Sequence, residues 1–514
     1  MSTIWNLEEF FKNKDECLKE IDNLKNIYER IKTLKNISLE KNLFIFLEIY
    51  DLYQKMQYEL LSYFELLEAS NYHNSDLRIL RSKFKQIDDK ICETFDEVFS
   101  IIIKNRLIEK YKSNKDYEKY SKLIENYSIF KSDSIEKHIN TFNTLMNDIT
   151  SSNTNILNFS HTFIEIINNY FKEVNEALED DSEDYIYYLH EETEKEDLKK
   201  LLETIKQNSN LNDNYYSILL DYVPKKINIS FEEARKEIIE SFNIFGTEYR
   251  SILKSIFSGT NLDYEKRKYK TNSDITYMIS NHKSFASINY EKNIASAFTL
   301  AHELGHMVSH DIKYKHGKTS INEINSASEL FSLTNEIIFG NHLLKKANTL
   351  DEKIAISKEL INLYYANLFE TSAIAELTLM IANKIKTKSY IDLKTINSLS
   401  NRIIRKYNLY NKKGFWINNE ILNNIDVVFY IYGIIGASNI YNSIQTKTFS
   451  VSDYIEVLAQ KNEGPDSFAI FDKLGCNPCH EENIKKTFEN YNNLLENTKD
   501  LIYEKKLKRR KNGI

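Results

Sequence analysis

The spacing of apolar residues predicts long helices over the first half of the chain. In residues 43–67 and 76–103, apolar side chains recur at three- and four-residue steps with charged residues between them, as on helices that bury one face. Helix breakers are rare, and no glycine precedes Gly246. We therefore expect a mainly helical protein. Residues 1–175 would form an N-terminal helical lobe, and residues 176–514 a second region that carries the chemistry.

A different pattern occupies residues 259–295. Apolar and polar residues alternate over 274–280 and 284–290, which predicts a small β-sheet. An edge strand of such a sheet could hold an extended peptide through backbone hydrogen bonds. On this hypothesis Ser287 and Asn289 are candidate substrate-binding residues.

Composition is ordinary for a globular protein, with 42% apolar and 28% charged residues among 514, and a net charge of -7. This charge gives no general attraction to nucleic acid or to anionic lipid. A basic cluster at residues 505–511 is interpreted as the solvated end of a helix. The N-terminus lacks the features of a secretory signal, and we expect no run of roughly 18 uncharged residues that could span a membrane. We therefore expect a cytoplasmic protein with neither nucleic acid nor membrane as a partner.

The segment from His302 to His306 reads His-Glu-Leu-Gly-His and carries the most specific chemical pattern. On a helix, residues four apart share a face, so both imidazoles can reach one metal ion. Glu303 lies beside them, where a general base would take a proton from a metal-bound water. Apolar residues on both sides predict a helix over about 295–311 that holds the pair rigidly.

A third metal ligand must come from elsewhere. The long spaced zincin pattern would need Gly at position 309 and His at 312, but the chain has Ser309 and Ile312. His310 follows on the same helix, yet three ligands in line on one straight helix cannot surround one ion. A ligand from a second helix is therefore required.

Carboxylates on the segment 321–339, which we predict to be helical, are the candidates for this ligand. They are Glu323, Glu329 and Glu336. We choose Glu329, because the small residues beside it would let two helices approach closely. The predicted site then holds one Zn²⁺ per chain with His302, His306 and Glu329, although such a donor set also accepts manganese or cobalt.

Two cysteines raise an alternative class. Cys476, Cys479 and His480 spell the attachment pattern of c-type haem. That chemistry belongs to exported proteins, and Asn477-Pro478 indicates a turn before a helix. We interpret the thiols as small apolar groups beside this turn, with a haem or thiol redox protein as the alternative.

Several stretches in order resemble the oligoendopeptidase F branch of the thimet oligopeptidase family of zinc peptidases. They are Ser230–Tyr249, Ser287–His306, Ala327–Glu336, Phe429–Tyr432 and Leu474–Glu482. The resemblance covers roughly residues 225–500, and its most specific part surrounds His302. It implies a helical two-lobed peptidase with zinc on the channel wall, the third ligand at Glu329, and short peptides as substrates.

The late tyrosine-rich segment departs from the family in part. The family places a His and a Tyr there that bind substrate and stabilise the oxyanion, and here the matching positions fall near Asn423 and Ile434. Tyr430 and Tyr432 remain as candidate catalytic donors to the oxyanion. The alternative for each is an aromatic residue that only packs a helix.

Two further departures concern substrate binding. An Arg-Gln pair of the family is replaced near Glu370-Thr371, and a glycine-rich loop corresponds to residues 268–273, which contain no glycine. The sequence therefore predicts a divergent zinc endopeptidase that hydrolyses short peptides. The alternative is a catalytically silent relative that only binds peptide.

Overall fold

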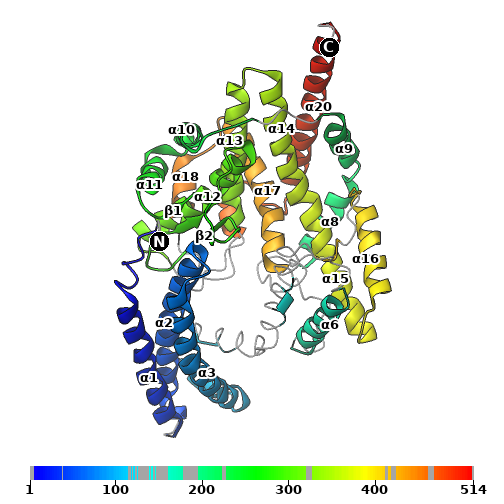
Figure 1. Cartoon of the computed structure of the whole chain (residues 1–514). Coiled ribbons are helices and arrows are strands. Elements are labelled where there is room, and N and C mark those ends of the chain that lie inside the picture. Colours follow the sequence, from blue (N-terminus) through cyan, green and yellow to red (C-terminus); the bar gives the residue numbers. More distant parts are fainter. Residues whose placement is uncertain are drawn as a thin grey trace. The chain divides into compact units, whose positions relative to one another are not determined.

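The computed structural model describes most of the chain as helix, together with one small sheet, as the sequence predicts (Figure 1). The described residues are 5–36, 39–113, 160–177, 195–222, 227–319, 327–410, 415–417, 424–460 and 468–511, with isolated positions between 117 and 145.

The chain divides into two compact units. Residues 1–131 and 259–289 form unit 1, and residues 132–258 and 290–514 form unit 2. This division differs from the lobe boundary predicted at residue 175. The sheet segment comes from the middle of the chain but packs with the N-terminal segment, for example through Phe285 against Trp5, which precedes α1. The helical pattern of the sequence does not indicate that residues 259–289 belong with the N-terminal unit.

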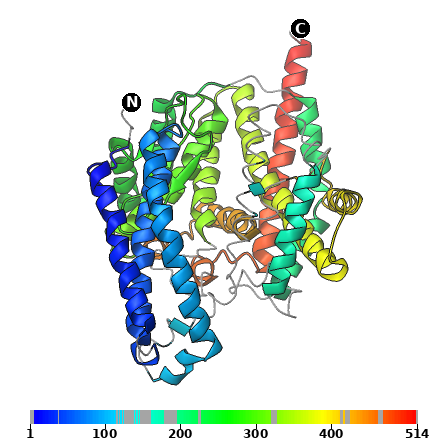
Figure 2. The same cartoon turned by 60° about the horizontal axis from the view of Figure 1, so that its bottom comes forward.

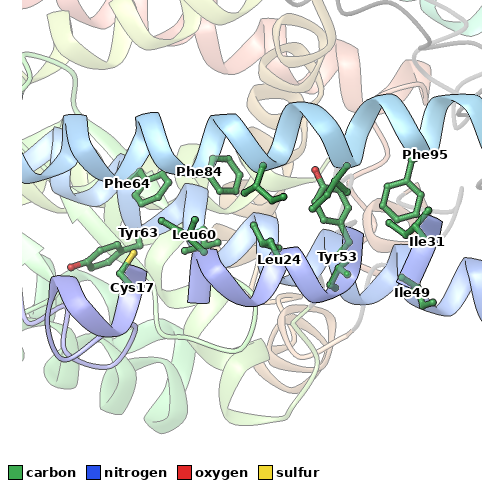
Figure 3. Packing of buried hydrophobic residues seen from close by; sticks show 14 of the residues in the cluster. Cys17, Leu24, Ile31, Ile49, Tyr53, Leu60, Tyr63, Phe64, Phe84 and Phe95 are labelled. Carbon is green, nitrogen blue, oxygen red and sulfur yellow. The ribbon is translucent and has the colours of Figure 1, made fainter. Parts of the chain in front are cut away.

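Unit 1 is built on a bundle of three long helices, α1 (Lys14–Asn36), α2 (Leu43–Ser70) and α3 (Ser75–Lys104), which lie side by side in both views (Figures 1 and 2). Helices α2 and α3 match the helices predicted over residues 43–67 and 76–103. Two 3₁₀ turns, η1 (Glu40–Asn42) and η2 (Leu107–Tyr111), flank them. Buried side chains from all three helices interlock along the bundle, including Leu24, Tyr53 and Phe95 (Figure 3).

The sheet of unit 1 has the order β1-β3-β2, with β1 at Leu262–Asp263, β2 at Ile275–Tyr277 and β3 at Phe285–Ser287. Strand β3 is central: Ser287 pairs with Asp263 in a parallel ladder and with Ile275 in an antiparallel one. The strand that carries Ser287 is therefore not an edge of the sheet; β1 and β2 are its edges, and peptide binding at an edge stays a prediction. Alternation identified the strands but not their order.

Unit 2 contains the remaining helices. They are α6 (Ser160–Ala177), α8 (Lys195–Gln207), α9 (Leu211–Asp221), α10 (Phe231–Ser241), η5 (Phe242–Phe245), α11 (Gly246–Ser258), α12 (Ile294–Lys315), α13 (Ser328–Lys346), α14 (Leu350–Tyr365), the π-helical turn η6 (Ala366–Glu370), α15 (Thr371–Lys388), α16 (Leu393–Lys406), α17 (Asn424–Gln445), α18 (Val451–Leu458), α19 (Phe468–Lys473) and α20 (Glu481–Lys511). Helix α13 packs on both α12 and α17.

Two predicted helix boundaries shift. The helix expected at 295–311 is α12, which extends slightly further at both ends. The helix expected at 321–339 is α13, which continues to Lys346, while residues 320–326 lie outside the described part. The helix was predicted to about residue 339, and α13 continues past Gly340, whose missing side chain allows close packing. A β-carbon there would meet Leu360 and Phe298 at 2.6 and 2.7 Å.

Helix α17 corrects a second expectation. The segment Val427–Gln445 has 19 residues without a charged side chain, long and apolar enough to cross a membrane by length and composition. The sequence prediction that no such stretch exists is therefore wrong. In the structure, 72% of the apolar window is buried inside the protein, which is typical of a core helix. Its apolar character follows from its central position in unit 2.

Candidate metal centre

Helix α12 carries the two histidines, and side-chain hydrogen bonds hold its N-terminal turn. The Asn293 side chain accepts from the backbone N–H of Ser296, and the Ser296 hydroxyl returns the contact to the backbone N–H of Asn293, which closes a capping box. Such a cap satisfies backbone donors that the first helical turn leaves unpaired. His302 and His306 follow on one face, with their Nε2 atoms 3.2 Å apart.

Helix α13 brings Glu329 to these histidines because Gly305 allows the two backbones to approach. A β-carbon at Gly305 would lie 2.5 Å from Cα of Ser332, which no side chain tolerates. The Ser332 hydroxyl in turn donates to Glu329 Oε2 at 2.8 Å. The glycine inside the histidine pattern is thus a packing requirement for the third candidate ligand.

A buried hydrogen-bond chain fixes the register of α13 on α12. Asn335 Nδ2 donates to the carbonyl oxygen of Ala301 at 3.1 Å, and the hydroxyl of Tyr249 in α11 donates to Asn335 Oδ1 at 2.8 Å. Both side chains are fully buried. Because a buried amide that loses its partners costs about 1–3 kcal/mol, this chain disfavours any slip between the helices.

Helix α17 supports α13 from another side. A β-carbon at Gly433 would lie 2.8 Å from the carbonyl carbon and oxygen of Glu329. The turn that carries the candidate ligand therefore rests directly on the backbone of α17. The site is built from three helices, rather than the two that the sequence predicted.

The three predicted ligands converge on one point. Glu329 Oε2 lies 3.4 Å from His302 Nε2 and 3.5 Å from His306 Nε2, and the imidazole nitrogens are 3.2 Å apart. Tetrahedral zinc with bonds of about 2.0–2.2 Å has ligand-to-ligand edges of roughly 3.4 Å. All three separations match such an edge, so the donor set fits a tetrahedral ion with a fourth position open.

Glu336 orients one of the histidines. Its Oε1 lies 2.7 Å from His302 Nδ1, so the ring donates from Nδ1 and directs Nε2 toward Glu329. Carboxylates commonly hold metal-binding histidines in this way. The sequence offered Glu336 only as an alternative ligand. Glu336 lies seven residues, or two helical turns, after Glu329, so both side chains share one face of the helix. This spacing is the sequence feature that could have revealed the orienting role of Glu336.

Burial and the neighbouring charges shift the pKa of His302 in opposite directions. Burial lowers the pKa of His302, but the hydrogen bond and charge of Glu336, with the charges of Glu329 and Glu303, outweigh it and raise the pKa to about 10. Burial raises the pKa of Glu336. Without a metal ion, His302 therefore holds a proton at neutral pH.

The charges around Glu329 lead to an ionised carboxylate. Burial raises the pKa of Glu329, but His306 and His302 and the hydrogen bond from Ser332 outweigh it and lower the pKa to about 2. His306 Nδ1 is buried and has no hydrogen-bond partner within the described residues. A buried carboxylate ionised beside two imidazoles is the state that metal binding requires.

The candidate catalytic residues differ in their surroundings. Glu303 is buried beside the two histidines on α12. The ring of Tyr430 stacks over His302, with centroids 6.4 Å apart and planes inclined by 14°. Tyr432 is fully buried and packs edge-on against Phe468 in α19, with centroids 5.2 Å apart. The structure thus brings Tyr430, rather than Tyr432, next to the metal ligands.

Ser287 and Asn289 are engaged within unit 1. The Ser287 hydroxyl is fully buried and unpaired among the described residues. Asn289 donates from its backbone to Asp274 and from its side chain to Thr271. These contacts tie down the loop that replaces the family's glycine-rich segment. A substrate-binding role for the two side chains stays a prediction.

The remaining predicted positions are Glu323, Asn423, Ile434 and the two late cysteines. Glu323 and Asn423 lie outside the described residues, and Ile434 is fully buried. Burial raises the pKa of both Cys476 and Cys479, the latter to about 12. Reactive thiols require a lowered pKa, so both side chains fit the structural interpretation.

A second group that could hold a cation lies on the surface of unit 2, formed by Glu237, Glu240 and His342. Lys346 already occupies it, with Nζ 2.7 Å from Glu237 and 2.9 Å from Glu240. The ammonium group neutralises the carboxylates, so we assign no metal to this cluster.

Comparison with known sequences finds no family profile that matches the chain. An oligoendopeptidase F homologue of Borreliella burgdorferi is 26% identical over 294 residues, which are 50% of this chain and 48% of that protein. Oligopeptidase PepF of Bacillus subtilis is 24% identical over 184 residues, which are 35% of this chain and 27% of that protein. The matches therefore span about half or less of these relatives.

Solved structures agree over nearly the whole fold. A peptidase candidate of Chlamydophila abortus superposes with a TM-score of 0.74 at 16% identity, over 98% of this chain and 99% of that one. Oligoendopeptidase F of Enterococcus faecium superposes with a TM-score of 0.60 at 15% identity, over 97% and 99%. Together these likenesses show that the chain has the mainly helical fold of these solved peptidases. Within this class, the chain is similar to proteins of the oligoendopeptidase F type.

Proposed function

We propose that this protein is a zinc-dependent endopeptidase that hydrolyses short peptides, with one Zn²⁺ per chain held by His302, His306 and Glu329. The observation that carries the proposal is the donor triangle of 3.2, 3.4 and 3.5 Å edges. Three donors with an open fourth position are typical of catalytic rather than structural zinc. The oligoendopeptidase F relatives support peptides as the substrate class.

Each residue of the site would have a separate task. Zinc bound there would supply Lewis acidity to a peptide carbonyl and to the attacking water. Glu303 would accept the proton of that water and pass it to the leaving amine, because its carboxylate lies beside the histidines without serving as a ligand. Glu336 would keep the His302 ring in one tautomer and orientation.

Tyr430 is the residue that we propose as donor to the developing oxyanion, because its ring lies over His302. Removing one such donor typically costs about 3 kcal/mol of transition-state stabilisation. Tyr432 is placed to support the packing of α17 instead, since its ring lies against Phe468.

The test measures cleavage of a quenched fluorescent peptide library by the full chain, with and without a chelator, beside Glu303→Gln. We expect cleavage by the parent protein, loss on chelation, recovery when zinc is restored, and zinc-loaded but inactive Glu303→Gln. Zinc bound at one per chain without any cleavage by the parent would overturn the peptidase proposal and favour a silent peptide-binding relative.

A further inference from the structure

Two buried serines each lie three residues after a candidate ligand. Ser309 follows His306 on α12, and Ser332 follows Glu329 on α13. Each hydroxyl donates to the backbone carbonyl oxygen of the ligand before it, over 2.9 Å from Ser309 and 3.1 Å from Ser332. Such a bond is the ordinary one for a serine inside a helix. By itself it gives neither residue a task at the site.

Ser332 has a second acceptor. Its hydroxyl also donates to Glu329 Oε2 at 2.8 Å, and this oxygen lies 3.4 Å from His302 Nε2 and 3.5 Å from His306 Nε2. A hydroxyl has one proton, and its bond to an ionised carboxylate is stronger than its bond to a neutral carbonyl group. The shorter contact is therefore the main bond of Ser332, and it falls on the oxygen that faces the imidazoles.

The turn that carries Glu329 begins without a side-chain cap. Helices α10, α12 and α14 each start with a complete capping box, whereas the N-cap position of α13 is Ala327, which forms no side-chain cap. A glutamate side chain populates many rotamers, and fixing it costs conformational entropy. The hydroxyl of Ser332 restricts the direction of the carboxylate in this uncapped turn.

Helix packing fixes the position of Ser332 itself. The side chain is fully buried, and a β-carbon on Gly305 would lie 2.5 Å from Cα of Ser332 and 2.9 Å from its backbone nitrogen. The backbones of α12 and α13 are thus in contact at this residue. An alanine would allow the same contact with Gly305, but it could not orient the carboxylate.

We propose that Ser332 is a positioning residue of the metal centre, whose hydroxyl holds the Glu329 carboxylate with Oε2 turned toward His302 and His306 and so sets the affinity of the site. This inference rests on the proposed function, because it requires Glu329 to be a ligand. Each carboxylate oxygen has two lone pairs, so the bond from Ser332 leaves one on Oε2 for an ion. Hydrogen bonds to ligating carboxylates commonly orient them in this way.

The test compares Ser332→Ala with Ser309→Ala in the full chain. Both substitutions remove a buried hydroxyl and its bond to the carbonyl oxygen of a ligand, but only the first also removes the bond to Glu329 Oε2. Competition with a chromophoric chelator measures zinc affinity. We expect this affinity to fall by about 10- to 100-fold in Ser332→Ala and to stay close to that of the parent in Ser309→Ala.

The visible absorption of the chain loaded with Co²⁺ gives a second readout, because it depends on the arrangement of ligands around the ion. The spectrum should change in Ser332→Ala and match that of the parent in Ser309→Ala. Melting temperatures of the metal-free variants measure any loss of stability separately.

A serine that only stabilised α13 would lower the melting temperature and leave zinc affinity and the cobalt spectrum unchanged. That result in Ser332→Ala, or an equal loss of affinity in both variants, would overturn this inference and leave the proposed function intact. A parent chain that binds no zinc would instead contradict the proposed function and this inference together.

Discussion

Gly433 and Glu329 are packed backbone against backbone: a β-carbon on the glycine would lie 2.8 Å from the carbonyl oxygen of the candidate ligand. Gly433→Ala should therefore push the first turn of α13 away from the histidines. We expect a stability loss of about 1–3 kcal/mol and a fall in zinc affinity of more than tenfold, measured by competition with a chromophoric chelator.

Gly340→Ala is the matched comparison, because its new methyl group would meet side-chain atoms of Leu360 and Phe298 rather than backbone. It should cost stability but leave zinc affinity close to that of the parent. If both variants bind zinc alike, the contact between Gly433 and Glu329 does not position the ligand.

Glu329→Ala should abolish stoichiometric zinc binding. It removes one of three protein donors, so the expected loss exceeds the roughly 10- to 100-fold typical of partners that only orient a ligand. Metal analysis after gel filtration measures the retained zinc, and circular dichroism checks the fold. Full retention of zinc would exclude Glu329 as a ligand.

Glu336→Gln should have a graded effect, because an amide oxygen can still accept from His302 Nδ1 but carries no charge. We expect zinc affinity to fall by about 10- to 100-fold, while the fold persists. Glu359→Gln is the control, since Glu359 is a partly buried carboxylate whose pKa burial raises, with a smaller contribution from the charge of Glu336. It should bind zinc as the parent does.

Zinc binding should release a proton. In the metal-free protein the pKa of His302 is raised to about 10, so the ring is protonated at pH 7 and an ion must displace that proton. Apparent affinity should rise with pH from 6 toward 10. Calorimetry at pH 7.5 in two buffers of different ionisation enthalpy counts the protons released. Identical heats in both buffers would contradict the raised pKa.

The same shift predicts the stability of the metal-free protein. Because the folded pKa lies above the usual value of 6.5, the contribution of the protonated ring is fully present below about pH 6.5 and is lost as the pH rises toward 10. Chemical denaturation of the chelated protein at pH 6.5 and 9.5 measures this loss.

Tyr430→Phe should lower kcat by roughly 100-fold with little change in KM, if the hydroxyl acts on the transition state. Zinc content should not change. Tyr432→Phe should leave kcat within a fewfold of the parent, because that ring is buried against Phe468. A large loss of kcat in Tyr432→Phe alone would reverse the assignment.

The grouping of the candidate ligands was predictable because the pattern behind it is local. Four-residue spacing puts His302 and His306 on one face of any helix, whatever the rest of the chain does. Small neighbours indicated Glu329, and its donor atom does lie with theirs. The same reasoning found the long helices of unit 1, since amphipathic periodicity reports burial of one face.

Tertiary features were less accessible. Periodicity does not give strand order, so the central position of β3 was missed. The uncharged stretch of α17 is visible in the sequence and was overlooked; the structure was needed only to show that it is buried in the protein. The close approaches at Gly305 and Gly433 each join two separate helices, and the pattern within one helix does not specify its partner.

The donor triangle has a consequence for how the molecule unfolds. All three donors belong to unit 2, so an ion bound there would act as a removable cross-link between α12 and α13 and would stabilise that unit by an amount that grows with the logarithm of its affinity. Unit 1 gains nothing directly. Calorimetric scans should therefore show one transition that moves to lower temperature on chelation and another that stays in place. The shift on chelation would then identify which transition is the unfolding of unit 2.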